Sequence, residues 1–198
     1  MSKDIIKPGI VLLIVTVIAA GLLGAVNIAT KDIIAAEEAE TKANSMKSVL
    51  PDAEEFDEEK QNDNKDYSII KKYTKGVDES GNTVGYAVEV STKGFSTGLN
   101  LMIGITTDGV IRGVAVLSHG ETPGLGANAK EKWKDDDHIW VDQFAGKSGE
   151  LSVTKGDSPA DDEIQAITGA TITSDAITNA VNTVSDFYNS VLSEGGDK

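Results

Sequence analysis

The sequence contains no cysteine among its 198 residues. This absence excludes disulfide bonds, thiolate-ligated iron–sulfur clusters, c-type haem attachment and flavin linkage through sulfur. Aromatic residues are also scarce, at 5%, but hydrophobic residues make up 39% of the chain, so aliphatic side chains can supply a core. We therefore expect one folded domain, and any redox chemistry must use a cofactor held by another kind of side chain.

Basic residues are also fewer than acidic ones. The chain has 18 basic and 32 acidic residues, for a formal net charge of −14. Such a chain repels the phosphates of nucleic acids, so we expect no nucleic-acid partner. The acidity favours solubility, and the sequence shows no local cluster that would single out a surface for a basic partner.

Charged residues are absent from 9–29, a run of apolar and small residues with only Thr16 and Asn27 as notably polar side chains. A helix of this length reaches roughly 30 Å, enough to cross the hydrocarbon core of a bilayer. A cleaved signal peptide is the alternative, but its apolar region is usually only about 7–15 residues long. The sequence therefore predicts a retained anchor in membrane lipid, while lysines on both sides of it leave its orientation open.

The anchor is followed by two segments of different composition. Residues 30–50 are rich in Ala, Glu and Lys and lack Gly and Pro, which predicts a helical stalk that ends before Pro51. Residues 51–66 are rich in acids and amides, which predicts a solvated connector. A calcium site is the alternative there, but the Gly and the distal Glu of an EF-hand loop are missing around Asp63, Asn64 and Asp66.

Strand patterns follow the connector. Valine and tyrosine side chains alternate with smaller or polar residues over 84–90, which predicts a half-buried strand. The runs 101–106 and 110–117 flank Asp108-Gly109, a dipeptide suited to a tight turn, which predicts an antiparallel hairpin. We further expect a short helix over 127–133, and core or docking roles for Trp133, Trp140 and Phe144.

The last predicted element is a helix. Apolar side chains recur at helical spacing near the end of the chain: Ile177, Val181, Val184, Phe187, Tyr188 and Val191. Thr173 or Ser174 is expected to cap its N-terminus by accepting a backbone N–H bond. Strands followed by a terminal helix predict an α+β domain.

Two loops have residue types suited to binding. The first is 119–127, in which Gly124, Gly126 and Ala129 match a degenerate dinucleotide fingerprint, G-x-G-x-x-A. A dinucleotide fold requires a βαβ unit, and the preceding hairpin argues against one. The alternative is a tight loop whose glycines serve only the backbone.

The second loop is 168–174, which opens the terminal helix. A helix N-terminus presents unpaired N–H groups and a partial positive charge, so a phosphate is stabilised beside it. Small residues at Gly169 and Ala170 would allow a phosphate to approach the backbone. No Walker lysine follows, which excludes a P-loop. Taken alone, the segment is better explained as a simple helix cap.

The sequence ETPGLG at 121–126, followed by TGATITS at 168–174, resembles the FMN-binding domain of the Rnf complex G subunit. The C subunit of the sodium-pumping NADH:quinone reductase has a similar domain, but it usually has additional sequence, so length favours Rnf. The resemblance implies an electron-transfer subunit of an ion-translocating ferredoxin:NAD⁺ oxidoreductase in the inner membrane. It implies a cytoplasmic N-terminus at 1–8, an anchor at 9–29, a stalk and connector at 30–66, and an extracytoplasmic FMN-binding domain at 67–198. The partners it implies are the other Rnf subunits and a flavin transferase.

In this family a flavin transferase joins the FMN phosphate to the last residue of an [S/T]-G-A-[S/T] motif, which is Thr171 here. The resemblance implies further cofactor-binding residues at both loops, without catalytic or metal-binding residues: Thr168, Gly169, Ala170, Thr173, Ser174, His119, Glu121, Thr122, Pro123, Gly124, Leu125 and Gly126. Many members have an acid three residues before the motif, where this chain has Gln165. The alternative function is a non-redox extracytoplasmic binding module, in which the two loops are only a turn and a helix cap.

Overall fold

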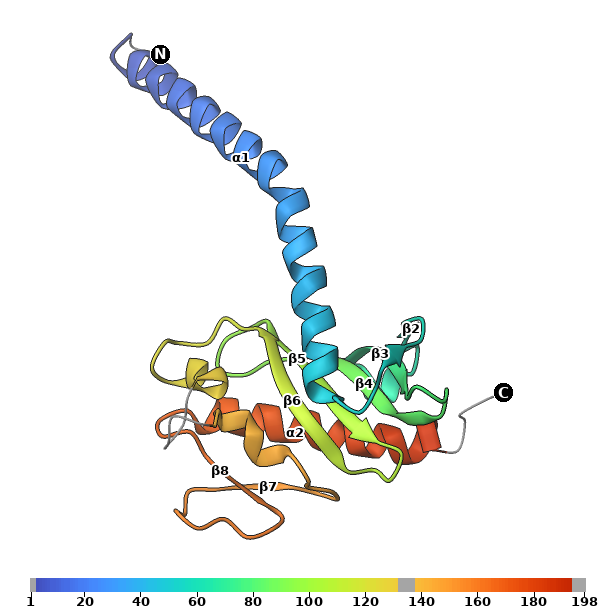
Figure 1. Cartoon of the computed structure of the whole chain (residues 1–198). Helices are drawn as coiled ribbons and strands as arrows, with labels where there is room; N and C mark the ends of the chain where they lie inside the picture. The colour runs from blue at the N-terminus through green and yellow to red at the C-terminus, as the bar shows by residue number, and fades with distance from the viewer. Residues whose placement is uncertain (1–2, 132–137, 194–198) are drawn as a thin grey trace. The chain divides into compact units, whose positions relative to one another are not determined.

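The computed structural model describes residues 3–131 and 138–193 and divides the chain into two compact units, 1–41 and 42–198. A single helix, α1 (Lys3–Val49), runs from the first unit into the second (Figure 1). By length and composition it is the one helix in the described part of the chain able to cross a membrane. The predicted anchor and stalk therefore form one continuous helix, which ends before Pro51 as expected.

The second unit is built on an antiparallel sheet in which the four long strands, β3 to β6, lie side by side in sequence order. Its strands are β1 (Glu55–Phe56), β2 (Lys60–Gln61), β3 (Ile70–Val77), β4 (Thr83–Thr92), β5 (Leu99–Thr106) and β6 (Ile111–Ser118). The predicted strand at 84–90 and the hairpin of 101–106 with 110–117 are confirmed by β4, β5 and β6. Gly109 in the hairpin turn has a φ of +77°, a conformation that glycine adopts without steric cost.

The acid-rich segment after Pro51 contains structure that its composition did not predict. Both β1 and β2 pair with β3, and the Phe56 side chain packs against a small core formed with Val49, Ala87 and Met102. The 3₁₀ helix η1 (Lys65–Tyr67) follows, and Asn64 caps it by accepting a hydrogen bond from the Asp66 backbone N–H. Parts of this segment therefore pair with β3, although most of its residues are exposed.

The main core lies between the sheet and α2 (Thr171–Phe187), which continues into the π-helical turn η4 (Tyr188–Leu192). The helix buries the face that its apolar periodicity predicted, including Ile177, Val181 and Val184. Trp140 and Phe144, in the 3₁₀ helix η3 (Trp140–Phe144), are fully buried and stack edge to face with ring centroids 5.6 Å apart. Their prediction as core residues is confirmed, as is the α+β fold.

Two smaller features complete the domain. The parallel pair of β7 (Ser152–Thr154) and β8 (Glu163–Gln165) leads into the start of α2. The short helix expected at 127–133 is represented by a 3₁₀ helix, η2 (Gly126–Lys130), and its expected end and Trp133 lie outside the described residues. Because the strand before the glycine-rich loop belongs to an antiparallel meander, the loop does not open a βαβ unit.

The end of α1 packs against glycine residues on the face of the sheet opposite α2. Gly104 and Gly113 pair across β5 and β6. A Cβ atom on Gly104 would lie 2.0 Å from the Val49 carbonyl oxygen, and one on Gly113 would lie 3.1 Å from the Val49 Cα. The helix end thus approaches the sheet more closely than any larger side chain would permit, and Val49 and Leu50 are buried there.

A cluster of charges joins the last turns of α1 to the sheet. The Lys42 ammonium pairs with Glu59 and with Glu89, the latter at 2.6 Å, and Lys72 also pairs with Glu59 at 3.0 Å. Burial alone would lower the pKa of Lys42, but the hydrogen bonds and charges of the two glutamates outweigh it and raise that pKa. Burial would likewise raise the pKa of Glu59, but the two lysines lower it.

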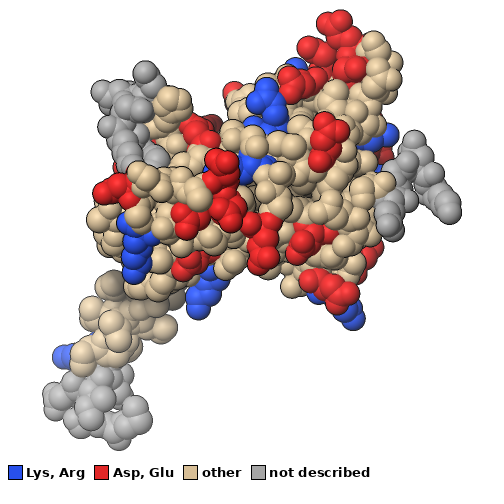
Figure 2. All heavy atoms as spheres, turned by 90° about the horizontal axis from the view of Figure 1, so that it is seen from below, with Lys and Arg blue, Asp and Glu red and all other residues tan. Residues whose placement is uncertain are grey.

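The molecular surface reflects the acidic composition. Figure 2 shows acidic side chains spread over most of the visible face, while lysine and arginine side chains form a few separate groups. A partner that contacts this face meets mainly negative charge, which disfavours a nucleic acid there.

Candidate functional site

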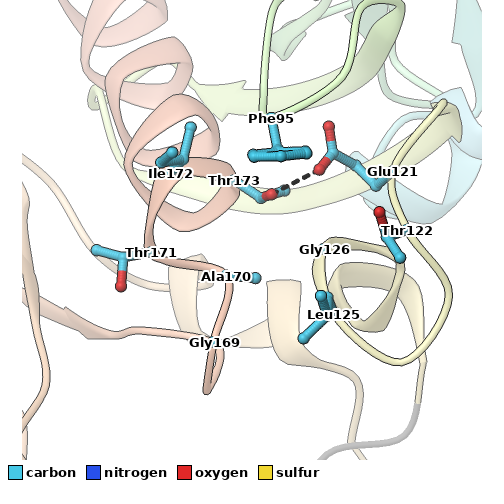
Figure 3. A pocket seen from close by; sticks show the side chains of 10 residues that line it. All are labelled: Phe95, Glu121, Thr122, Leu125, Gly126, Gly169, Ala170, Thr171, Ile172 and Thr173. Carbon is cyan, nitrogen blue, oxygen red and sulfur yellow. Dashed lines mark hydrogen bonds between the residues drawn. The ribbon is translucent and has the colours of Figure 1, made fainter.

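A pocket of about 340 Å³ lies at one end of the strands of the sheet. In an antiparallel sheet the end of one strand lies beside the start of the next, so the end of β4, the start of β5 and the end of β6 all lie on this side of the sheet. The loops 93–98 and 119–126 leave from it and meet the beginning of α2. The pocket is lined by Phe95, Glu121, Thr122, Leu125, Gly126, Gly169, Ala170, Thr171, Ile172 and Thr173 (Figure 3). Its volume is in the range typical of small-molecule sites.

A tight turn fixes where α2 begins. The Ala170 N–H donates to the Ile167 carbonyl at 2.9 Å, and Gly169 within this turn has a φ of +76°. The Ser174 hydroxyl donates to the Ala170 carbonyl and accepts from the Ile167 N–H at 2.9 Å, so it ties the first helical turn back to the loop.

The prediction that Thr173 or Ser174 caps this helix is wrong. The helix begins at Thr171, and its N-cap residue is Ala170, which makes no side-chain cap hydrogen bond. The glycine turn directs the chain into the helix before either hydroxyl is reached. Thr173 and Ser174 therefore lie in the first turn and bond to neighbouring segments instead.

The backbone at the start of α2 is suited to an anion. The first helical hydrogen bond runs from the Ser174 N–H to the Ala170 carbonyl. The N–H groups of residues 171–173 therefore have no acceptor within the helix, and together they carry the positive end of its dipole. All three residues line the pocket, so a phosphate bound there would be stabilised.

The three threonines near this turn differ in the availability of their hydroxyls. Thr173 is fully buried, and its hydroxyl donates to Glu121 Oε2 at 2.7 Å. Thr168 is exposed and is not among the residues that line the pocket. Thr171 is half-buried, lines the pocket and occupies the first helical position.

An apolar wall borders the same pocket. Phe95, Leu125 and Ile172 are 67%, 42% and 57% exposed, and they are the large hydrophobic side chains left exposed in the described part of residues 42–198. All three line this one pocket. Exposed apolar side chains that gather around a concavity mark a ligand site.

Glu121 lies inside the pocket wall and is only 6% exposed. Its Oε1 accepts a hydrogen bond from the Ser96 backbone N–H at 3.0 Å, and its Oε2 accepts the bond from Thr173. Figure 3 shows Glu121 beside Phe95 and Thr173, with the bond to Thr173 drawn. This carboxylate thus connects three segments that are far apart in sequence.

The remaining residues singled out from the sequence divide into two groups. Thr122, Leu125 and Gly126 line the pocket with Glu121, as do Gly169 and Ala170 from the second loop. The structure places five others outside the pocket lining: Thr168, Ser174, His119, Pro123 and Gly124. Gly124 has a φ of +75° and so serves the turn, in which the Leu125 N–H donates to the Thr122 carbonyl.

The motifs in the sequence did not predict Phe95 and Ile172 as pocket residues, because both are apolar and the motifs are polar and glycine-rich. Phe95 lies in a short segment bounded by Gly94 and Gly98. Ile172 falls off the buried face of α2, where an isolated apolar residue carries little signal. Ile172 lies inside the second loop motif, which was an available signal, whereas Phe95 is far from both motifs in sequence.

Comparisons with known proteins match both parts of the chain. The FMN-binding domain family model matches residues 94–186, which include both loops of the pocket, and the RnfG N-terminal region model matches residues 1–49. The G subunit of the Na⁺-translocating ferredoxin:NAD⁺ oxidoreductase complex of Acetobacterium woodii is 35% identical, over 91% of this chain and 89% of the relative. The G subunit of an ion-translocating oxidoreductase complex of Methanosarcina acetivorans is 33% identical, over 94% of this chain and 95% of the relative.

Among solved structures, the chain is similar to the crystal structure of Shewanella oneidensis NqrC, with 23% identity, a TM-score of 0.45, and coverage of 74% of this chain and 68% of that one. The sequence relatives cover nearly the full chain and are G subunits, as the paired loop motifs predicted. The chain belongs to the family of G subunits of ion-translocating ferredoxin:NAD⁺ oxidoreductase complexes and contains the FMN-binding domain of that family.

Proposed function

We propose that Thr171 carries FMN through a phosphoester bond and that the chain uses this flavin to transfer electrons within an ion-translocating ferredoxin:NAD⁺ oxidoreductase complex. The electron-transfer role follows from the family and its FMN-binding domain. The covalent bond and its position are the further step. They rest on the geometry at the start of α2.

The observation that carries the linkage is the difference between the three threonines. Thr173 is buried and its hydroxyl is occupied by Glu121, while Thr168 lies outside the pocket lining. Thr171 combines a position in the pocket with a place at the positive end of α2. A phosphate esterified to its hydroxyl would stay beside the free N–H groups of the first turn.

The pocket fits the rest of the cofactor. Phe95, Leu125 and Ile172 offer apolar surface to the flat isoalloxazine ring. Gly126 and Gly169 have no side chains that would fill the pocket, and a Cβ atom on Gly169 would lie 3.1 Å from Leu125 Cδ2. When bound, FMN supplies the capacity to accept and pass electrons, and the protein contacts set its potential. A phosphoester also needs no cysteine, which this chain lacks.

We place the chain in the inner membrane through the 9–29 segment of α1, in contact with lipid and with other subunits of the complex. Its domain is placed outside the cytoplasm, as the family resemblance implies. The transfer of FMN to Thr171 then needs a flavin transferase that reaches the turn at Thr168 and Gly169, which are exposed, and a donor in which the FMN phosphate is part of a phosphoanhydride. The Thr171 hydroxyl would lose its proton and attack the FMN phosphorus, the P–O bond of the anhydride would break, and the second phosphate group would leave.

The proposal is tested by producing the full chain together with a flavin transferase and measuring flavin fluorescence in denaturing gels. Wild type should fluoresce, and Thr171→Val, which removes the hydroxyl with little change in volume, should not. Thr168→Val is the matched control and should remain labelled. If the wild-type chain did not fluoresce, the covalent bond would be rejected. If its visible spectrum also lacked flavin bands, the alternative of a non-redox binding module would be favoured.

A further inference from the structure

We propose that Glu121 is a positioning residue that fastens the Phe95 loop to the first turn of α2 and lowers the reduction potential of the bound flavin. The fastening concerns the protein alone, while the effect on potential rests on the proposed function. We call the two hydrogen bonds of this carboxylate, from Ser96 N–H and from Thr173 Oγ1, the Glu121 bridge.

The bridge links three segments that border the pocket. Glu121 follows β6, Ser96 lies in the connection between β4 and β5, and Thr173 belongs to α2. The Phe95 side chain is 67% exposed, so its own burial contributes little to holding its loop in place. A hydrogen bond from the neighbouring backbone N–H to a buried carboxylate is charge-assisted and stronger than a neutral one.

Two glycines make room for the bridge. A Cβ atom on Gly94 would lie 2.5 Å from Glu121 Oε1. A Cβ atom on Gly126 would lie 2.4 Å from Glu121 Oε2 and 2.5 Å from Thr173 Oγ1. Larger residues at either position would push the carboxylate away from its donors, so the backbone on both sides is shaped around it.

The bridge also sets the charge of the pocket. Among the described residues that line it, Glu121 is the one with a formal charge, and the others are apolar or neutral. Reduction adds negative charge to the flavin, which a nearby carboxylate in a poorly hydrated wall opposes. A neutral residue at this position should therefore raise the reduction potential, and the carboxylate lowers it.

The fastening is tested on the full chain without flavin, by hydrogen exchange of the peptide that contains Ser96. Glu121→Ala removes the acceptor of the Ser96 N–H, so this amide should exchange at least tenfold faster. The matched control is Asn182→Ala, because Asn182 also bridges two backbone groups, the N–H and carbonyl of Leu151, away from the pocket. It should leave Ser96 protected. Equal exchange in wild type and Glu121→Ala would overturn the proposal.

A second variant guards against a general folding defect. Gly126→Ala keeps Glu121 but inserts a methyl group between Glu121 Oε2 and Thr173 Oγ1. It should speed exchange at Ser96 in the same way, provided that far-ultraviolet circular dichroism shows a folded chain. Protection of Ser96 in both folded variants would reject the bridge as the cause.

The effect on potential is tested with Glu121→Gln on the flavin-loaded chain, because the amide keeps an acceptor for Ser96 and removes the charge. The equilibrium for flavin reduction should shift at least tenfold towards the reduced form, about 30 mV for a two-electron couple. Asn182→Ala should not change it. A Glu121→Gln potential equal to that of wild type would overturn the proposal, whereas a wild-type chain that takes up no flavin would refute the proposed function and leave the exchange test intact.

Discussion

Replacement of Gly104 by alanine should dislodge the end of α1 from the sheet. The added Cβ would lie 2.0 Å from the Val49 carbonyl oxygen, 2.6 Å from its carbonyl carbon and 3.1 Å from its Cβ. Because two of these atoms are backbone, no side-chain rotation relieves the clash. Either the helix end or strand β5 must move by roughly 1 Å or more, since interiors are closely packed.

The cost follows from the contacts that this movement disturbs. Overpacking of a well-packed site typically costs about 1–3 kcal/mol. Val49 and Leu50 are buried against the same face, and partial exposure of either side chain adds a fraction of its roughly 1.5–3 kcal/mol of burial free energy. We expect a loss of about 2–4 kcal/mol in the free energy of unfolding, which for a domain of this size lowers Tm by roughly 5–15 °C.

Thermal unfolding of the detergent-solubilised chain, followed by tryptophan fluorescence, measures this loss because Trp140 is fully buried. Gly156→Ala is the matched control, since a Cβ atom there would make only an ordinary contact, 3.5 Å from Thr154 Oγ1. It should melt within about 2 °C of wild type, because such surface changes cost under about 0.5 kcal/mol. If Gly104→Ala melted together with this control, the close approach of α1 to the sheet would be refuted.

Three further predictions concern the rest of the chain. The lowered pKa of Glu59 means that this carboxylate stabilises the folded chain above its ordinary pKa and that the stabilisation is lost as the pH falls through the lowered value. Acidification below about pH 5 should therefore lower the Tm of Glu59→Gln less than that of wild type, as measured by thermal melts. N-terminal sequencing of the mature protein should find the 9–29 anchor retained, and a mature chain that begins after residue 20 would contradict this. A truncated chain of residues 30–198 should unfold in one cooperative transition, because its core is made within residues 42–198, and a broad melt would contradict this.

The elements with strong periodicity could be predicted from the sequence. The uncharged span of α1, the alternating valines of β4 and the helical spacing of Ile177, Val181 and Val184 each depend on many residues of one kind. For β4 and α2 the local pattern and the tertiary contacts favour the same state, whereas residues 9–29 of α1 are exposed and follow the local pattern alone.

Strand β3 was not predicted from the sequence. Its buried face includes Thr74 and Gly76, and neither contributes an apolar signal. Gly76 is small because a Cβ there would lie 2.6 Å from Leu50 Cδ2 and 2.8 Å from Ala53 Cβ. A strand that buries glycine against another segment has a polar pattern in the sequence, although it is central to the packing.

The two motif loops of the candidate site were predicted from the sequence, but the third loop, 93–98, which carries Phe95, was not. Glu121 and Thr171 belong to motifs, whereas Phe95 comes to the pocket only because the end of β4, the start of β5 and the end of β6 lie on the same side of the sheet. The start of α2 was also placed too late, because the hydroxyls of Thr173 and Ser174 are ordinary capping groups in sequence terms. Their actual partners, Glu121 and the Ile167–Ala170 turn, depend on the tertiary fold.

The most direct test of the account is to locate the flavin by tandem mass spectrometry of the tryptic peptide 156–198, which follows Lys155 and contains no internal lysine or arginine. Wild-type protein produced with a flavin transferase should give this peptide with the added mass of FMN less one water. Fragmentation should place the whole addition on Thr171. An unmodified peptide, or flavin on Thr168 or Thr173, would contradict the assignment.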